Sequence, residues 1–92
     1  MLDRVRMALR ITTTAFDSEI DDLISAALAD LDIAGVTAPT KNDPLIVRAV
    51  ITYCKAHFGE PDEYDRLKAA YDEQKAQLQM ATGYTDWREI GG

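Results

Sequence analysis

Residues 43–58 read DPLIVRAVITYCKAHF, and this stretch decides the fold. Asp43 is a favoured helix N-cap, and Pro44 suits the first helical position, where its missing N–H is not needed. Apolar residues occupy more than one side of the helix that follows, which is typical of a buried central element. The β-branched run at residues 50–52 also suits a strand, but the length of the stretch and the stop at Gly59 favour a helix.

Amphipathic helices are expected on both sides of this central helix. Apolar residues recur at helical spacing over residues 2–11, 15–34 and 62–81, and polar residues fill the opposite faces. The outer face of the first helix is basic and that of the second is acidic. The chain beyond has no helical period. We therefore predict an all-α fold, with a small four-helix domain over residues 1–83 built around a buried central helix, and a short C-terminal tail over residues 84–92.

Particular residues mark where the expected second helix begins and ends. Thr14 can cap it, with Asp17 three residues on completing a capping box. Gly35 stands where a C′ residue is needed. Asp30 and Asp32 lie near the C-terminus of the helix, where the helix dipole disfavours negative charge. The sequence gives no reason for these two acids.

The chain is short and acidic. It has 92 residues, with 16 Asp and Glu against 10 Lys and Arg, and a net charge of -6. Nonspecific DNA binding normally needs a surplus of cations to displace counterions from the phosphates, so this balance argues against a DNA-binding protein. A chain of this size buries only a modest core, and we expect it to gain burial by assembling with copies of itself or with a larger partner.

The single cysteine and the N-terminal segment bear on the compartment. Cys54 has no partner for an internal disulfide, and its place on the apolar helix indicates a buried thiol in a reducing environment. The N-terminal segment is too charged for a signal peptide, and no apolar run approaches the roughly 18 residues of a membrane span. We expect a soluble protein, made in the cytosol, that does not associate with a membrane.

No group of residues fits catalysis or metal binding. Cys54 and His57 are three residues apart on one helix with no second histidine, so a core thiol and an edge imidazole are favoured over a catalytic or zinc pair. Asp17, Asp21 and Asp22 lack the glycine-containing loop of a cation site, which indicates a solvated acidic face. All the glycines fall at expected helix ends or at the chain terminus, so no phosphate-binding loop is present. We predict no enzymatic activity, no cofactor and no metal.

The basic first helix was compared with helices that bind DNA. Arg4, Arg6 and Arg10 can touch phosphates, but no helix carries the clustered Arg, Asn and Gln that read a major groove. The other interpretation is a subunit interface, in which these arginines meet Asp21 and Asp22 of a neighbouring copy. Electrostatic complementarity of this kind fixes the register of an interface more than it adds affinity.

Three large side chains, Tyr84, Trp87 and Ile90, recur at every third residue of the tail. They either fold back on the core or stay exposed for a partner, and the sequence leaves both open. Because Trp and Tyr often anchor interfaces, partner binding by these residues is a reasonable hypothesis.

Several short segments carry a resemblance to a known family. They read LRI at 9–11, DDLI at 21–24, DPL at 43–45, TYCKAHFG at 52–59 and YDRLKAAY at 64–71. Together they resemble the tailed-phage head-tail connector (adaptor) family, whose members are also labelled phage DNA packaging proteins. The resemblance covers nearly all of residues 2–80, mostly at core positions and without a catalytic signature.

The resemblance implies a viral structural protein. A small helical subunit would form a ring with copies of itself, beneath the portal protein at the virion head-tail junction, after synthesis in the host cytoplasm. A tail-completion or stopper protein would be a further partner. DNA would pass through the ring without specific binding, because a carboxylate-rich channel gives it nothing to hold. Head-to-tail packing joins different surfaces of adjacent copies, which suits a basic first helix and an acidic second one.

The alternative is a small helical regulatory module that binds protein or DNA, and the basic N-terminal face is its only support. The mass in solution separates the two hypotheses. Rings, or monomers that form rings on a portal, indicate the connector, whereas a stable dimer that shifts DNA on a gel indicates the regulator.

Overall fold

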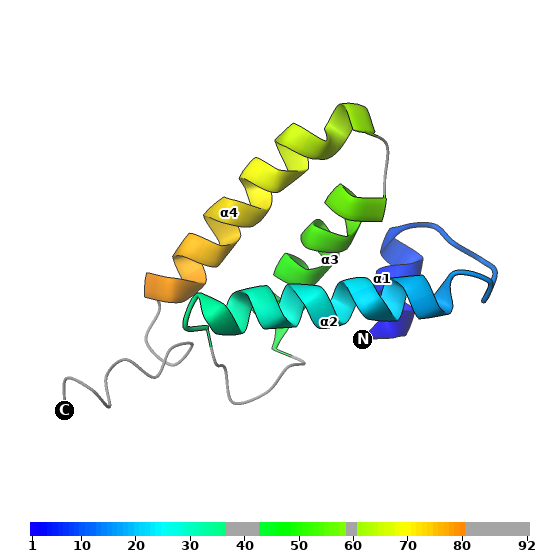
Figure 1. The fold of residues 1–92 in the computed structure, drawn as a ribbon, viewed down its shortest axis with the longest axis horizontal. Helices are drawn as coiled ribbons and strands as arrows, with labels where there is room; N and C mark the ends of the chain where they lie inside the picture. The colour runs from blue at the N-terminus through cyan, green and yellow to red at the C-terminus, as the bar shows by residue number, and fades with distance from the viewer. Residues whose placement is uncertain (37–42, 59–60, 81–92) are drawn as a thin grey trace.

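The computed structural model describes residues 1–36, 43–58 and 61–80, which form four α-helices (Figure 1). In chain order the elements are α1 (Leu2–Ala8), α2 (Asp17–Ile33), α3 (Pro44–Phe58), a 3-10 helix η1 (Pro61–Glu63) and α4 (Tyr64–Met80). These described residues contain no β-strand. The predicted all-α fold with four helices is confirmed, and the strand alternative for residues 50–52 is wrong.

The central place of α3 is also confirmed, because it contacts each of the other three α-helices. In Figure 1, α2 crosses in front of α3, α4 lies beside α3, and α1 lies near the N-terminal half of α2. The buried side chains of α3 are Ile46, Val47, Ala49, Val50, Cys54 and Ala56. The helix is not covered all round, however, since Leu45, Arg48 and Lys55 are exposed.

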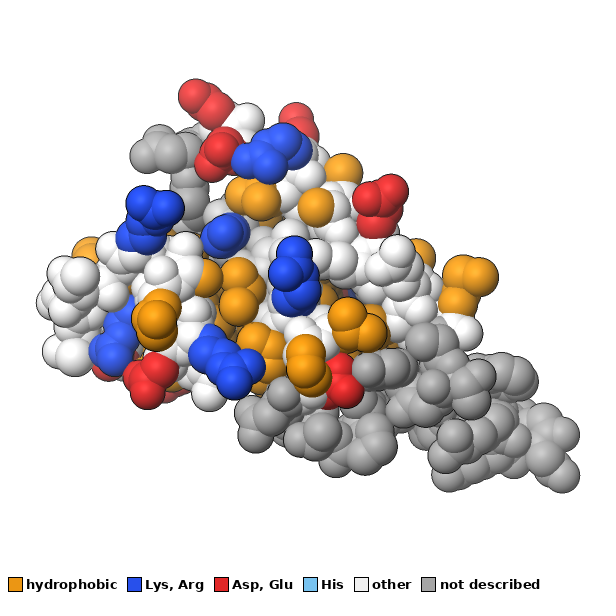
Figure 2. Space-filling model, turned by 180° about the vertical axis from the view of Figure 1, so that it is seen from behind, with side chains coloured by type: hydrophobic (Ala, Val, Ile, Leu, Met, Phe, Trp, Pro, Cys, Tyr) orange, Lys and Arg blue, Asp and Glu red, His pale blue; other side chains and the backbone are white. Residues whose placement is uncertain are grey.

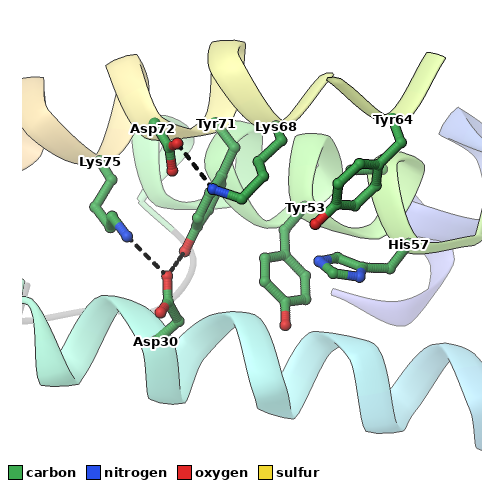
Figure 3. Close-up of a pocket in the computed structure, with 9 residues that line it drawn as sticks. Asp30, Tyr53, His57, Tyr64, Lys68, Tyr71, Asp72 and Lys75 are labelled. Carbon is green, nitrogen blue, oxygen red and sulfur yellow. Dashed lines mark hydrogen bonds and ion pairs between the residues drawn. The ribbon is translucent and has the colours of Figure 1, made fainter. Parts of the chain in front are cut away.

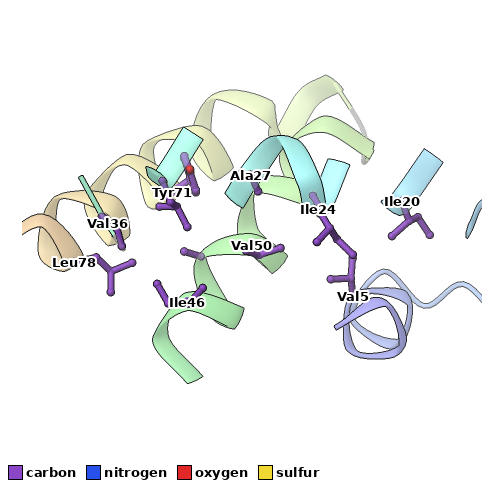
Figure 4. Packing of buried hydrophobic residues seen from close by; sticks show 12 residues of the cluster. Val5, Ile20, Ile24, Ala27, Val36, Ile46, Val50, Tyr71 and Leu78 are labelled. Carbon is purple, nitrogen blue, oxygen red and sulfur yellow. The ribbon is translucent and has the colours of Figure 1, made fainter. Parts of the chain in front are cut away.

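All four helices contribute to a single apolar core (Figure 4). Val5 of α1 lies near Ile20 and Ile24 at one end of the cluster, while Leu78 and Val36 lie at the other end. A helix as short as α1 is only marginally stable by itself, so its contacts with the core, above all the burial of Val5, help to hold it in place.

The junction between α1 and α2 differs from the prediction. α1 ends at Ala8 and does not continue to Ile11, because Arg10 adopts a left-handed backbone conformation with φ of 61°. The N–H of Arg10 donates to the Met7 carbonyl and that of Ile11 to the Arg6 carbonyl, both at 3.0 Å, which is the hydrogen-bond pattern of a Schellman motif.

The predicted capping box at the start of α2 is wrong. Phe16, not Thr14, is the N-cap, and no side chain caps the helix. Thr13 Oγ1 instead accepts a hydrogen bond from the N–H of Ala15 at 3.2 Å, in the turn before the helix. The carboxylate of Asp17 binds an arginine of α1 and is therefore not used as a capping group.

Two other helix ends follow the prediction. Gly35, with φ of 89°, is the C′ residue of α2, and its N–H donates to the Asp32 carbonyl at 2.9 Å. The N–H of Val36 donates to the Leu31 carbonyl at 2.8 Å, which completes a second Schellman motif. At the start of α3, the Asp43 carboxylate accepts a hydrogen bond from the Leu45 N–H at 2.9 Å, as expected of an N-cap.

The last helix begins later than predicted, because residues 61–63 form η1. The predicted domain boundary after residue 83 and the tail at 84–92 lie outside the described residues. Among the residues that are described, none of the helices has the length and apolar character needed to span a membrane.

Candidate assembly surfaces

Arg6 connects α1 to α2 within one chain. Its guanidinium donates to the two carboxylate oxygens of Asp17 at 3.1 and 3.2 Å, and to the carboxylate of Asp3 at 3.1 Å. The side chains of Arg6 and Asp17 are only 24% and 30% exposed, so this ion pair is partly shielded from water. Arg6, one of the predicted interface residues, is therefore matched in charge before a second copy arrives.

The other two arginines of the predicted basic face are placed differently. Arg4 and Arg10 are exposed, and neither side chain forms an ion pair or hydrogen bond with any described residue. Their charges are available to a partner. Of the three arginines in the predicted subunit interface, these two keep the expected position on the surface.

The acidic excess of the chain is located on α2. This helix has six carboxylates and no Lys or Arg, which gives it a formal charge of -6, equal to the net charge of the whole chain. Asp21 and Asp22, the predicted acidic half of the interface, are both exposed, as are Glu19 and Asp32. Formal positive and negative charges cancel in the rest of the sequence, so α2 accounts for the whole negative excess.

The outward face of α2 is flat between its acids. Ser18, Ser25, Ala26 and Ala29 are exposed on the side opposite to the buried residues of this helix. At the C-terminal end of the same face, the side chain of Ile33 is 86% exposed. We call this surface, from Ser18 to Ile33, the α2 face. It combines small side chains with the carboxylate of Asp22 among them, further carboxylates at its margins and one large apolar group.

A stripe of α3 faces away from α2. Leu45, Arg48 and Lys55 are exposed, Ile51 and Thr52 are half-buried, and their spacing of three and four residues puts them on one side of the helix. We call these five residues the α3 stripe. Figure 2 views the molecule from behind and shows Lys and Arg side chains alternating with hydrophobic ones across the middle of this side, with acidic side chains toward its edges.

A groove of about 240 Å³ opens at the N-terminal end of the α3 stripe. Leu45 and Arg48 of α3 and Gln74, Gln77 and Leu78 of α4 line it. The side-chain oxygen of Gln74 is buried and has no hydrogen-bond partner. A buried acceptor without a donor costs about 1–3 kcal/mol.

A second hollow, of about 150 Å³, lies among α2, α3 and α4 (Figure 3). Tyr71 donates a hydrogen bond to Asp30 Oδ2 at 2.6 Å, and Lys75 donates to the same oxygen at 3.2 Å. The hydrogen bond from Tyr71 is the main cause that lowers the pKa of Asp30, against the opposing effect of burial. Burial and the contact with Asp30 raise the pKa of Tyr71, so Tyr71 stays a neutral donor.

Aromatic rings line the rest of this hollow. The Tyr53 and His57 rings lie 4.3 Å apart between centroids, and the Tyr64 ring meets His57 edge-on at 5.6 Å. His57 is exposed, as predicted for an edge imidazole. In the part of the chain that the structure describes, no three His, Cys, Asp or Glu side chains converge as metal ligands.

Cys54 is a core residue, as predicted. Its side chain is fully buried, and desolvation raises the pKa of its thiol to about 12. The thiol is therefore protonated at neutral pH, and a thiolate is what nucleophilic attack or metal binding requires. Its chemistry is that of a small apolar side chain.

The sequence did not predict the Asp30–Tyr71–Lys75 cluster or the groove beside Leu45. One signal was present, because Asp30 stood at the wrong end of its helix for a carboxylate and therefore needed a cation or donor elsewhere. Tyr71 and Lys75, four residues apart on one face of the last helix, were available for that role. The predicted partner-binding residues Tyr84, Trp87 and Ile90 lie outside the described residues.

Comparison with known proteins gives one match. A protein family described as phage connector protein matches residues 1–85, a range that takes in all four helices. No curated protein and no solved structure matches the chain.

Proposed function

Because the chain belongs to the phage connector protein family, we propose that it is a structural subunit of the head-tail junction in a tailed bacteriophage. The family match over residues 1–85 is the observation that carries this proposal. In this role the protein needs no catalytic group and no cofactor. Its work is to present surfaces that other virion proteins cover.

Copies of the chain assemble as a ring beneath the portal protein, and DNA passes through the centre. The surface supports this part of the proposal. Met7 and Ile33 are large apolar side chains that are more than three-quarters exposed in the single chain, and assembly would remove them from water. A net charge of -6 keeps DNA from adhering to the ring, since the chain has no surplus of cations to replace counterions at the phosphates.

The mass of the particles in solution tests this function. Native mass spectrometry and sedimentation velocity would be run on the chain alone and with the portal protein of the same phage. We expect closed rings alone, or rings that form only on the portal. A chain that stays monomeric in both samples overturns the proposal, and a stable dimer that shifts DNA on a gel would instead support a regulatory module.

A phage that lacks the gene tests the same function in the cell. Heads should fill with DNA but fail to join tails, and the wild-type gene supplied in trans should restore complete particles. Normal virions from the deletion strain, seen by electron microscopy, would contradict a role at the head-tail junction.

A further inference from the structure

The α2 face and the α3 stripe lie on opposite sides of the molecule. The shortest extent of the chain is 18 Å, and Figure 1 is viewed along it with α2 in front of α3. The α2 face is opposite to the buried residues of α2, and the α3 stripe is opposite to those of α3, so the first is turned to the near side of the molecule and the second to the far side that Figure 2 views. A contact between two different faces of this kind is heterologous and repeats from copy to copy, whereas a two-fold dimer uses the same patch twice.

The residues proposed to meet also lie at the same end of the two faces. The end of α3 lies beside the start of α2, where the Phe16 and Phe58 rings meet edge-on at 5.5 Å, and from there α3 crosses obliquely behind α2 toward its other end (Figure 1). Ile33 and Leu45 are therefore at one end of the molecule, on opposite sides. If a second copy is placed behind the first in nearly the same orientation, its Ile33 comes close to the first copy's Leu45.

Charge is complementary in that arrangement. Asp21 and Asp22 lie on the N-terminal half of α2, without an ion pair to any described residue. Lys55 lies at the same end on the opposite side, and so does α1, which carries the exposed Arg4 and precedes Arg10. When copies stack in this way, the carboxylates of one copy lie against the cations of the next along this half of the contact. This favours one orientation of the neighbouring copies over the reverse.

Shape is complementary at the other end. Ile33 projects from the α2 face, and the groove of about 240 Å³ lies between Leu45 and Leu78 on the opposite side. A cavity of about 150 Å³ already holds benzene, so the groove has room for an isoleucine side chain. The small residues in the middle of the α2 face let the longer side chains of the α3 stripe approach its backbone.

We propose that adjacent copies of this chain join by packing the α2 face of one copy on the α3 stripe of the next, with Ile33 entering the groove beside Leu45. The inference rests on the proposed function, because it specifies how neighbours in the ring meet. Arg6 takes no part between copies, and Lys55 and Arg48 act with Arg4 and Arg10 as the cationic side of the contact.

Two single variants, each blocking one face, test the proposal. Ile33→Lys alters the α2 face and Leu45→Glu alters the groove, and both positions are exposed, so the fold is retained. Each variant alone should self-associate at least about tenfold more weakly than the wild type. An equimolar mixture should form heterodimers that grow no further, because only one intact α2 face and one intact groove can meet. Native mass spectrometry resolves these species by mass, with the portal protein added if rings need it.

Met80→Lys is the matched control. Met80 is 84% exposed and lies on the side of α4 turned away from its buried residues Tyr71 and Leu78, so the variant should assemble as the wild type does. If the wild type forms rings and both face variants form them equally well, the interface is wrong and the proposed function stands.

Failure of the mixed variants to form heterodimers, although each alone is impaired, also overturns the interface. If only Leu45→Glu is impaired, the groove holds another segment, such as the C-terminal tail, and the role given to Ile33 is wrong. A wild type that never assembles, alone or with the portal, overturns the proposed function and this interface together.

Discussion

At the scale of single residues, Asp30 shows how tertiary hydrogen bonds can offset an unfavourable position within a helix. A carboxylate in the last turn of a helix opposes the helix dipole by about 0.3–1 kcal/mol. The hydrogen bonds from Tyr71 and Lys75 go to this charged acceptor, and because Asp30 is 38% exposed the shorter bond, from Tyr71, is worth about 1–2 kcal/mol. The donors are 41 and 45 residues away in the sequence, so no local pattern around Asp30 could identify them.

Tyr71→Phe tests this contact. The ring stays in the core, but Asp30 loses its shortest hydrogen bond, so we expect the free energy of unfolding to fall by about 1–2 kcal/mol. Urea denaturation followed by circular dichroism measures the change. Tyr53→Phe is the control, because the hydroxyl of Tyr53 makes no hydrogen bond to a described residue and its loss should change stability little. Equal effects of the two substitutions would contradict the role given to Asp30.

The lowered pKa of Asp30 makes a prediction about acid stability. Because its pKa in the folded chain is below the ordinary value of 3.8, the unfolded state binds more protons in acid. The stabilisation is fully present above that value and is lost as the pH falls through the lowered pKa. Wild type should therefore exceed Asp30→Asn in stability at neutral pH, and the difference should shrink as the pH falls below 3.8.

Urea titrations of both proteins over this pH range provide the measurement. The Tyr71→Phe background is the control, since the hydrogen bond from Tyr71 is the main cause of the lowered pKa of Asp30. In that background the pH dependence of the difference should be weaker. A difference that stays constant with pH in the wild-type background would show that Asp30 contributes no acid-labile stability.

At the scale of the elements, the two Schellman motifs provide a matched pair of substitutions. Gly35 has φ of 89° with nothing within 4 Å of an added Cβ, so Gly35→Ala should cost about 1 kcal/mol through the backbone alone. Arg10 has φ of 61° with an exposed side chain, and Arg10→Gly should stabilise the fold by up to about 1 kcal/mol. Thermal unfolding measures both. Changes of the same sign would show that backbone strain at these positions is not the main effect.

The helices themselves could be predicted because their signals are local. Apolar periodicity identified α2, α3 and α4, and Asp43 and Gly35 marked true helix ends. The ends of the α1–α2 junction could not be predicted, because they depend on how α1 packs on α2. Arg10 takes a conformation more typical of glycine, and Asp17 binds Arg6 and so does not complete a capping box.

At the scale of the whole molecule, the sequence showed which helix carries each charge. It did not show which face of the folded molecule each helix forms. Arg4, Arg10, Asp21 and Asp22 are all exposed, and their place at a subunit interface stays a prediction. Arg6 belongs to the same helical pattern, and only the fold shows that it is paired within the chain. The groove could not be predicted either, since its walls come from α3 and α4.

The C-terminal tail gives the last prediction. If the tail serves to bind a partner, deleting residues 84–92 should leave a folded domain with an unchanged unfolding midpoint. The truncated chain should no longer assemble, since Tyr84, Trp87 and Ile90 are the kind of side chains that anchor a partner. Circular dichroism measures the first effect and sedimentation velocity the second.

A full-length variant separates the side chains of the tail from its length. Replacing Tyr84, Trp87 and Ile90 with alanine should reproduce the loss of assembly. Trp87 is the only tryptophan, so in the wild type its fluorescence should shift to shorter wavelength when the tail becomes buried on assembly. If the truncated chain instead unfolds at a much lower temperature, these residues belong to the core of the domain. The partner would then bind elsewhere, and the exposed faces of α2 and α3 would have to provide every contact between copies.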